Sequence, residues 1–142
     1  LGRVDELVGR HDPIRITLLD GLANALELAA LRDASDAPVR DRQRASQLLR
    51  ESIQLRQEVF GEYSPEVAEG WCRLAYSHLE DSPALAETYA RDAVRVGERS
   101  GDAETIRDSL SCLSSTLEEQ GKTDEAAEVR ELALAAARAA SR

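Results

Sequence analysis

Two histidines and two cysteines are the side chains of this sequence best suited to catalysis or metal binding. His11 and His78 are the bases that titrate near neutral pH, and neither stands at a spacing that pairs it with a nucleophile or a carboxylate. Cys72 and Cys112 lie 40 residues apart, which fits neither a zinc site nor a Cys-x-x-Cys redox motif. A glycine-rich phosphate loop is also missing from the sequence. The sequence therefore predicts a protein that is not an enzyme, with no metal site and no cofactor.

The cysteines and His78 have a simpler structural interpretation. Both cysteines fall at similar places in two predicted helices, so we expect free thiols packed at helix interfaces in a reducing compartment. A disulfide is the alternative, and the spacing alone leaves it open. His78 falls at a packing position, and we expect it to contact a neighbouring helix and not to bind a ligand.

The composition favours helices. The 142-residue chain is 42% hydrophobic but only 4% aromatic, and its apolar residues are mostly Leu, Ala and Val. Few β-branched residues and abundant Glu and Arg favour helix over sheet, so we expect one all-α domain over residues 1–142. No apolar run approaches the roughly 18–20 residues of a membrane span, and the N-terminus lacks the features of a signal peptide. These observations predict a cytoplasmic protein that does not bind membranes.

The acidic residues are concentrated in the second half of the chain. The net charge is −9, with ten acids and nine arginines in residues 1–60 but seventeen acids and nine basic residues in residues 61–142. An acidic surface repels phosphate groups, so direct binding to nucleic acid or to an anionic membrane is not expected. A basic or polar peptide or protein segment is a better partner.

Residues 63–99 hold the clearest structural unit, a pair of helices joined by a short turn. Ser64-Pro65 offers a hydroxyl cap followed by a residue suited to the first helical turn, and Ser82-Pro83 repeats that signal. Apolar residues recur at helical spacing after each start and give each helix one face to bury. These residues are Val67, Trp71, Leu74, Ala75 and Leu79 in the first helix and Ala86, Tyr89, Ala90, Ala93 and Val94 in the second. Such a short pair needs neighbours to enclose a core.

A looser copy of this unit precedes it. Residues 11–60 match it at an offset of 52 in the first helix and of 41 in the second, so about eleven residues are inserted between the two helices. The first helix of this copy is expected to run to about Leu31, and the second to begin at Pro38 with Asp36 as its cap. Residues 1–9 match the tail helix of a further repeat.

A third copy follows over residues 102–140. Its landmarks lie 39 or 40 residues after those of the central unit, and Ile106, Leu110, Leu113 and Leu117 form the apolar face of its first helix. Asp102 and Thr123 are expected to cap its two helices, and Gly121 to end the first of them in a left-handed conformation.

These repeats resemble the tetratricopeptide repeat in its longer-period form, as in kinesin light chains. The first helix in that pattern carries a large apolar residue, then Leu and a small residue, and the second carries small residues about seven apart. The matching residues are Leu19, Leu22 and Ala23, then Trp71, Leu74 and Ala75, then Leu110, Leu113 and Ser114, with Ala86, Ala93, Ala126 and Ala133 in the second helices. The resemblance covers almost the whole chain. It implies an α-solenoid of antiparallel helix pairs, a right-handed superhelix whose concave groove is lined by the first helices.

The resemblance also implies which residues face that groove. They are Thr17, Asp20, Asn24 and Glu27 in the first copy, Glu69, Cys72, Tyr76 and Glu80 in the second, and Asp108, Ser111, Ser115 and Glu119 in the third. The set is polar and net negative, with Tyr76 offering a flat apolar contact and Asn24 a donor and an acceptor for a peptide backbone. Asp20 stands where chaperone-tail-binding repeats need a cation, so that specialisation is not expected. A solvated helix face is the alternative for each residue.

We therefore expect a non-catalytic scaffold that binds a peptide or protein segment in the concave groove. The alternative is a structural or regulatory module that packs on a sibling domain or associates with itself. The apolar Leu132 and Leu134 of the last helix favour this alternative and suggest a homodimer through the terminal helices. The chain contains no Met and begins within a helical pattern, so we also expect a fragment of a larger protein.

Overall fold

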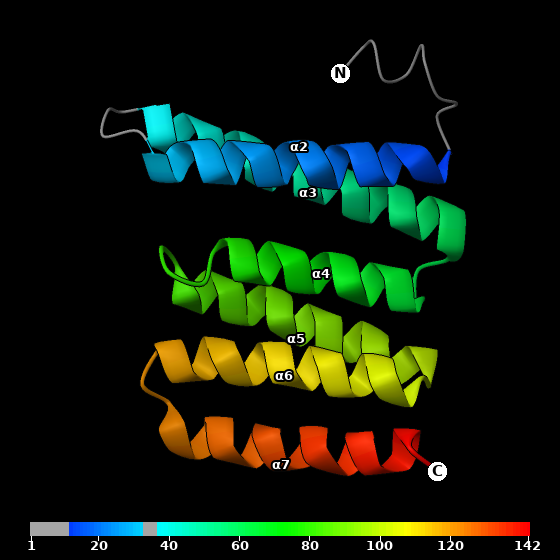
Figure 1. The fold of residues 1–142 in the computed structure, drawn as a ribbon. Helices are drawn as coiled ribbons and strands as arrows, with labels where there is room; N and C mark the ends of the chain where they lie inside the picture. The colour runs from blue at the N-terminus through cyan, green and yellow to red at the C-terminus, as the bar shows by residue number, and fades with distance from the viewer. Residues whose placement is uncertain (1–11, 33–36) are drawn as a thin grey trace. The chain divides into compact units, whose positions relative to one another are not determined.

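A computed structural model describes residues 12–32 and 37–142, which are helical almost throughout (Figure 1). The helices are α2 (Pro13–Arg32), α3 (Ala37–Phe60), α4 (Pro65–Ser77), α5 (Pro83–Ser100), α6 (Ala103–Glu119) and α7 (Thr123–Ala140). No strand occurs in these two ranges, so the prediction of an all-α chain is confirmed there. The predicted tail helix at residues 1–9 and the predicted cap Asp36 lie outside the described residues.

The chain divides into two compact units, Leu1–Gly61 and Glu62–Arg142. The described part of the first unit consists of α2 packed along α3. In the second unit α4 packs on α5, α5 on α6 and α6 on α7, while α4 also contacts α6 directly. Consecutive helices of this unit run in opposite directions, so α4 and α6 lie side by side and run the same way (Figure 1).

Several helix starts follow the predicted capping signals. Ser64 caps α4 by accepting a hydrogen bond at 3.3 Å from the N–H three residues further on, and Asp102 caps α6 in the same way at 2.9 Å. These bonds satisfy backbone donors that have no partner inside the helix. Helix α5 begins at Pro83 as predicted, although the Ser82 side chain makes no cap bond.

Three local predictions were wrong. Thr123 is the first residue of α7 and not its cap, because Lys122 takes the cap position without a side-chain bond. Helix α3 begins at Ala37, one residue before the predicted Pro38. Leu79 lies beyond the end of α4, in a tight turn whose N–H groups bond three residues back instead of four.

Two glycines end helices of the second unit in the left-handed region. Gly121, which was predicted to do so, has φ +74° after α6, and Gly101 has φ +74° after α5. A side chain at these positions would meet the steric cost that makes φ above zero uncommon outside glycine. Each glycine reverses the chain direction within a few residues, which lets the next helix run back antiparallel.

The predicted apolar faces form the core of each unit, with one exception on α2. Leu74 and Leu113 are buried in the second unit, and Leu19 and Ala23 are buried in the first. Leu22 was predicted to lie in the core with them, but 45% of its surface is exposed. Helix α3 covers one side of α2, and Leu22 lies outside that side.

Leu22 belongs to a second apolar face of α2, which we call the α2 outer face. It consists of Ile14, Leu18 and Leu22, which are four residues apart and therefore share one side of the helix, and all three are exposed. Leu28, further along α2, is also exposed. Helix α2 is thus apolar on the side that contacts α3 and on a side that the described residues leave in solvent.

Aromatic packing joins α4 to α5. The Trp71 and Tyr89 rings stack with centroids 5.9 Å apart, and the His78 ring lies 5.7 Å from Tyr89. His78 therefore contacts a neighbouring helix, as predicted. On its other side α5 approaches α6 closely, since a Cβ added to Gly97 would lie 3.1 Å from the Ser109 hydroxyl.

Glu87 of α5 is the centre of a polar network that holds the corner between α6 and α7. Its carboxylate accepts hydrogen bonds from Arg91 at 2.7 Å, Gln120 at 2.7 Å and Lys122 at 2.8 Å, and Arg91 also pairs with Glu125 of α7 at 2.8 Å. Only 12% of the Glu87 side chain is exposed. Burial raises the pKa of Glu87, but the bonds from Lys122, Gln120 and Arg91 outweigh this effect and lower the pKa from 4.5 to about 2.

This network predicts an acid-dependent loss of stability. A carboxylate whose pKa is lower in the folded state stabilises that state above the unfolded pKa, so the contribution of Glu87 should disappear as pH falls from about 4.5 through about 2. The shift corresponds to at most about 3 kcal/mol, and the solvent exposure of Arg91 and Lys122 reduces it to roughly 1–2 kcal/mol. Urea denaturation should show Glu87→Gln less stable than wild type by this amount at neutral pH and equally stable at the acid end.

Glu128→Gln is the matched control, because Glu128 is an exposed acid of α7. This variant should follow the wild-type profile at each pH. A Glu87→Gln deficit that stays constant from neutral to acid pH would show that lost packing, and not lost charge, causes the deficit.

Candidate functional site

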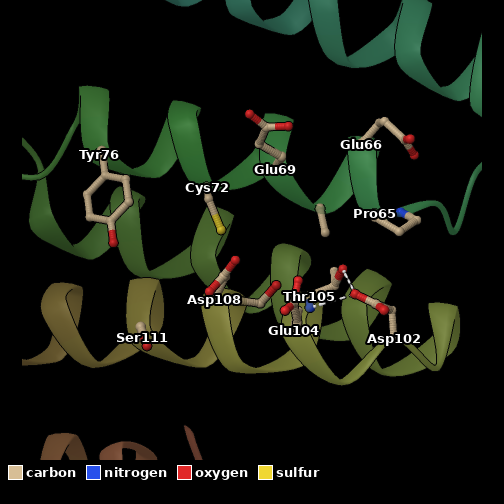
Figure 2. A pocket seen from close by; sticks show the side chains of 12 residues that line it. Pro65, Glu66, Glu69, Cys72, Tyr76, Asp102, Glu104, Thr105, Asp108 and Ser111 are labelled. Atoms are coloured by element: carbon tan, nitrogen blue, oxygen red, sulfur yellow. Dashed lines mark hydrogen bonds between the residues drawn. The ribbon is translucent and has the colours of Figure 1, made fainter. Parts of the chain in front are cut away.

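A pocket of about 500 Å³ lies between α4 and α6 in the second unit (Figure 2). It is formed by the facing sides of two helices that run in the same direction. The lining residues are Pro65, Glu66, Ala68, Glu69, Cys72 and Tyr76 from α4, and Asp102, Glu104, Thr105, Asp108, Ser109 and Ser111 from α6 and its cap. The pocket therefore runs along nearly the whole of α4, from Pro65 to Tyr76, and along the N-terminal half of α6 as far as Ser111.

Five of the twelve residues predicted to face a groove line this pocket. They are Glu69, Cys72, Tyr76, Asp108 and Ser111. These residues meet because the repeat offset of 39–40 residues puts equivalent positions of α4 and α6 at the same height.

The other three predicted residues of the second unit lie elsewhere. Ser115 of α6 is half-buried, and its hydroxyl donates to the Ser111 carbonyl at 3.1 Å. Glu80 is exposed in the turn after α4, and Glu119 is exposed at the last residue of α6.

Acidic side chains dominate the pocket. Five of the twelve lining residues are Asp or Glu, and none of the twelve is Lys, Arg or His. One acid serves structure, since Asp102 accepts bonds from the Thr105 N–H and hydroxyl, and both bonds lower the pKa of Asp102. Asp108 pairs with its exposed neighbour Arg107 at 2.8 Å. The site is suited to hold a positively charged group, because a bound cation would meet several carboxylates and no lining cation.

The far end of the pocket is different in character, with an aromatic ring and a thiol. Tyr76 is half-exposed and lines the pocket at the C-terminal end of α4 (Figure 2). Burial and the nearby thiols of Cys112 and Cys72 raise the pKa of Tyr76, while a bond with Ser115 opposes this. A ring with one wet face can stack on an apolar or cationic side chain of a ligand.

The sequence interpretation missed the first turns of α4 and α6. Glu66, Asp102 and Glu104 line the pocket there, and of these only Asp102 was named from the sequence, as a helix cap. Their positions in the sequence could have identified them. Glu66 and Glu104 lie in the first turns of α4 and α6, and the first turns of two neighbouring parallel helices lie at the same end of the pocket.

The four predicted groove residues of the first unit all lie on α2. Thr17 and Asn24 are exposed and Glu27 is half-buried. Asp20 differs from the expectation of an accessible groove residue, because it is buried and forms an ion pair at 2.6 Å with Arg56 of α3. Arg56 also bonds Ser52 at 3.4 Å. A carboxylate facing an arginine on the next helix binds that arginine in preference to solvent or ligand.

The described residues contain no arrangement of three His, Cys, Asp or Glu side chains that could hold a metal ion. None of the helices in the described part of the chain has both the length and the apolar character needed to cross a membrane. No protein-family model matches this chain, and a search of curated proteins gives no significant match.

The buried pair predicts a large effect of removing one partner. Asp20→Asn should destabilise the protein by about 3–5 kcal/mol in urea denaturation, because it leaves the Arg56 charge buried without its counterion. The double variant Asp20→Leu/Arg56→Met should recover most of that loss, since it removes both charges. Asn24→Ala, an exposed change one turn further along α2, should shift stability by less than about 0.5 kcal/mol. An Asp20→Asn variant within that same margin would contradict a structural role for the pair.

Proposed function

We propose that this chain is a non-catalytic, tetratricopeptide-type scaffold whose α4–α6 pocket binds a basic segment of another protein. In this proposal the helix pairs form a right-handed α-solenoid, and the pocket is part of its concave groove. The protein supplies shape and charge to its partner and carries out no reaction.

The order of helix contacts supports the repeat architecture. In a stack of helix pairs, each first helix contacts its own second helix and also the first helix of the next pair. Helix α4 has both of these contacts, with α5 and with α6, and α5 contacts α6 as well. Capped starts at Ser64 and Asp102 and left-handed glycines at Gly101 and Gly121 recur as the repeat requires.

The observation that carries the functional proposal is the lining of the pocket. Five carboxylates and no basic side chain surround a space of about 500 Å³ with Tyr76 at one end. A Lys or Arg side chain of a partner would be attracted to this space, and a neighbouring apolar residue could rest on the Tyr76 ring. An acidic partner, including nucleic acid, would be repelled.

The proposal predicts charge-dependent peptide binding. An arginine- and lysine-containing peptide labelled with a fluorophore should bind in anisotropy titrations, and a peptide of the same length with Glu at those positions should not. Glu69→Gln/Asp108→Asn should weaken binding roughly fivefold, because two exposed charge interactions are each worth a few tenths of a kcal/mol to 1 kcal/mol. Added salt should reduce wild-type affinity more than that of the double variant.

Glu128→Gln/Glu131→Gln provides the matched control, since it removes the same charge from the exposed surface of α7. It should keep most of the wild-type affinity. If both double variants weaken binding equally, the peptide responds to net charge alone and the assignment to the pocket is wrong.

The α2 outer face favours a second candidate function, self-association or packing on a sibling domain. It presents three large apolar residues on one side of a helix, and monomeric proteins rarely expose contiguous apolar surface without a use. Leu132 and Leu134 of α7 are also exposed, but residues two apart on a helix point to different sides. The α2 outer face is therefore the better candidate for a homodimer through terminal helices.

This second function predicts a concentration-dependent mass. In sedimentation equilibrium, wild type should move from monomer toward dimer as concentration rises, and Leu18→Glu/Leu22→Glu should stay monomeric because it places charges in the interface. Leu132→Glu is the control on α7 and should behave as wild type. A wild-type protein that is monomeric at every concentration would rule out self-association.

A further inference from the structure

Two thiols meet beneath the α4–α6 pocket. Cys72 of α4 is half-buried and lines the pocket (Figure 2). Cys112 of α6 is fully buried at 0% exposure and donates to the backbone carbonyl of Cys72 at 3.9 Å. One thiol can thus be reached from solvent, and the other lies directly behind it.

The surroundings keep both thiols in place. The neighbouring Cys112 thiol and burial raise the pKa of the Cys72 thiol, and Ser109, which is buried on α6, opposes that shift. The two helices that carry the cysteines pack directly on each other. Neighbouring helices in contact bring the backbones of facing residues close to the separation that a disulfide spans.

We propose that Cys72 and Cys112 form a reversible disulfide that links α4 to α6 when the protein meets a low-molecular-weight disulfide. Cys72 is the entry thiol because it lines the pocket, and Cys112 is the resolving thiol because it is buried beside it. This modification site does not depend on whether a peptide binds in the pocket.

The exchange proceeds in two balanced steps. The Cys72 thiol loses its proton to solvent and attacks one sulfur of the small disulfide, which forms a mixed disulfide and releases one small thiolate that takes up a proton. The Cys112 thiol then loses its proton and attacks the Cys72 sulfur, which forms the protein disulfide and releases the second small thiol. The two protein thiols are oxidised, and the small disulfide is reduced to two thiols.

The position of Cys112 favours the second step, and the raised pKa of Cys72 slows the first step. The Cys112 sulfur already lies 3.9 Å from the Cys72 carbonyl oxygen, so its effective concentration is high and a mixed disulfide on Cys72 should not persist. The reactive species is the thiolate, which the raised pKa of Cys72 keeps scarce. The site is therefore a slow sensor of redox balance that settles to equilibrium, and is not a rapid peroxide detector.

The test is a redox titration of the full chain with glutathione. The folded protein is equilibrated with excess oxidised glutathione, quenched in acid, alkylated after unfolding, and analysed by intact mass. We expect both alkylation sites to disappear together, no glutathione to remain attached, and reduction by dithiothreitol to restore both thiols. Proteolytic digestion should yield a linked peptide pair containing Cys72 and Cys112, and circular dichroism should show unchanged helicity.

Single-cysteine variants separate the roles of the two thiols. Cys112→Ser should retain one glutathione on Cys72, because no thiol remains to displace it, and Cys72→Ser should leave the buried Cys112 unmodified. Wild-type protein that keeps a glutathione adduct, or whose two thiols both remain alkylatable at equilibrium, would overturn the proposal. The wild-type measurement decides the matter even if a serine variant fails to fold.

Discussion

The close packing of α5 against both α4 and α6 is the constraint on which the second unit depends. None of these helices can bury its apolar face alone, so α4 and α6 come together through the helix behind them. Trp71 and Tyr89 fix one side of α5 by stacking, and Gly97 allows α6 to approach the other side to within contact of Ser109. The pocket is a consequence of this arrangement, because α4 and α6 run parallel on a common support and leave a space between their facing sides.

Charged residues have different roles in the Glu87 network and in the pocket. The Glu87 network pairs its carboxylate with three donors and stabilises the corner between α6 and α7. The pocket carries five carboxylates among its lining residues and no basic one, and one of these carboxylates, Asp108, pairs with Arg107. Charge that is paired within the fold contributes stability, whereas an acidic lining attracts a basic partner.

The parts of this structure that depend on local sequence were predictable. Ser64, Asp102 and Gly121 act at helix ends because their side chains, or the lack of one, settle the local backbone geometry. Five of the residues expected to face a groove line the α4–α6 pocket, because the repeat offset fixes which positions of the two helices face each other. Two predictions failed for reasons beyond local sequence. Leu22 fits the apolar pattern but lies outside the side of α2 that α3 covers. Asp20 forms an ion pair with Arg56, which lies 36 residues further along the chain.

A comparison of equivalent positions explains why an open pocket with paired thiols forms in the second unit. At the repeat offsets of 52 and 41 residues, the buried pair Asp20 and Arg56 corresponds to Cys72 and Gly97. In the first unit an ion pair fills the space between the two helices. In the second unit Gly97 contributes no side chain, and α6 packs so closely that a Cβ at this position would lie 3.1 Å from the Ser109 hydroxyl. The close packing of α6 also places the Cys112 thiol against the backbone carbonyl of Cys72. The second unit has a glycine and a thiol where the first unit has a salt bridge, and this difference makes the proposed disulfide possible.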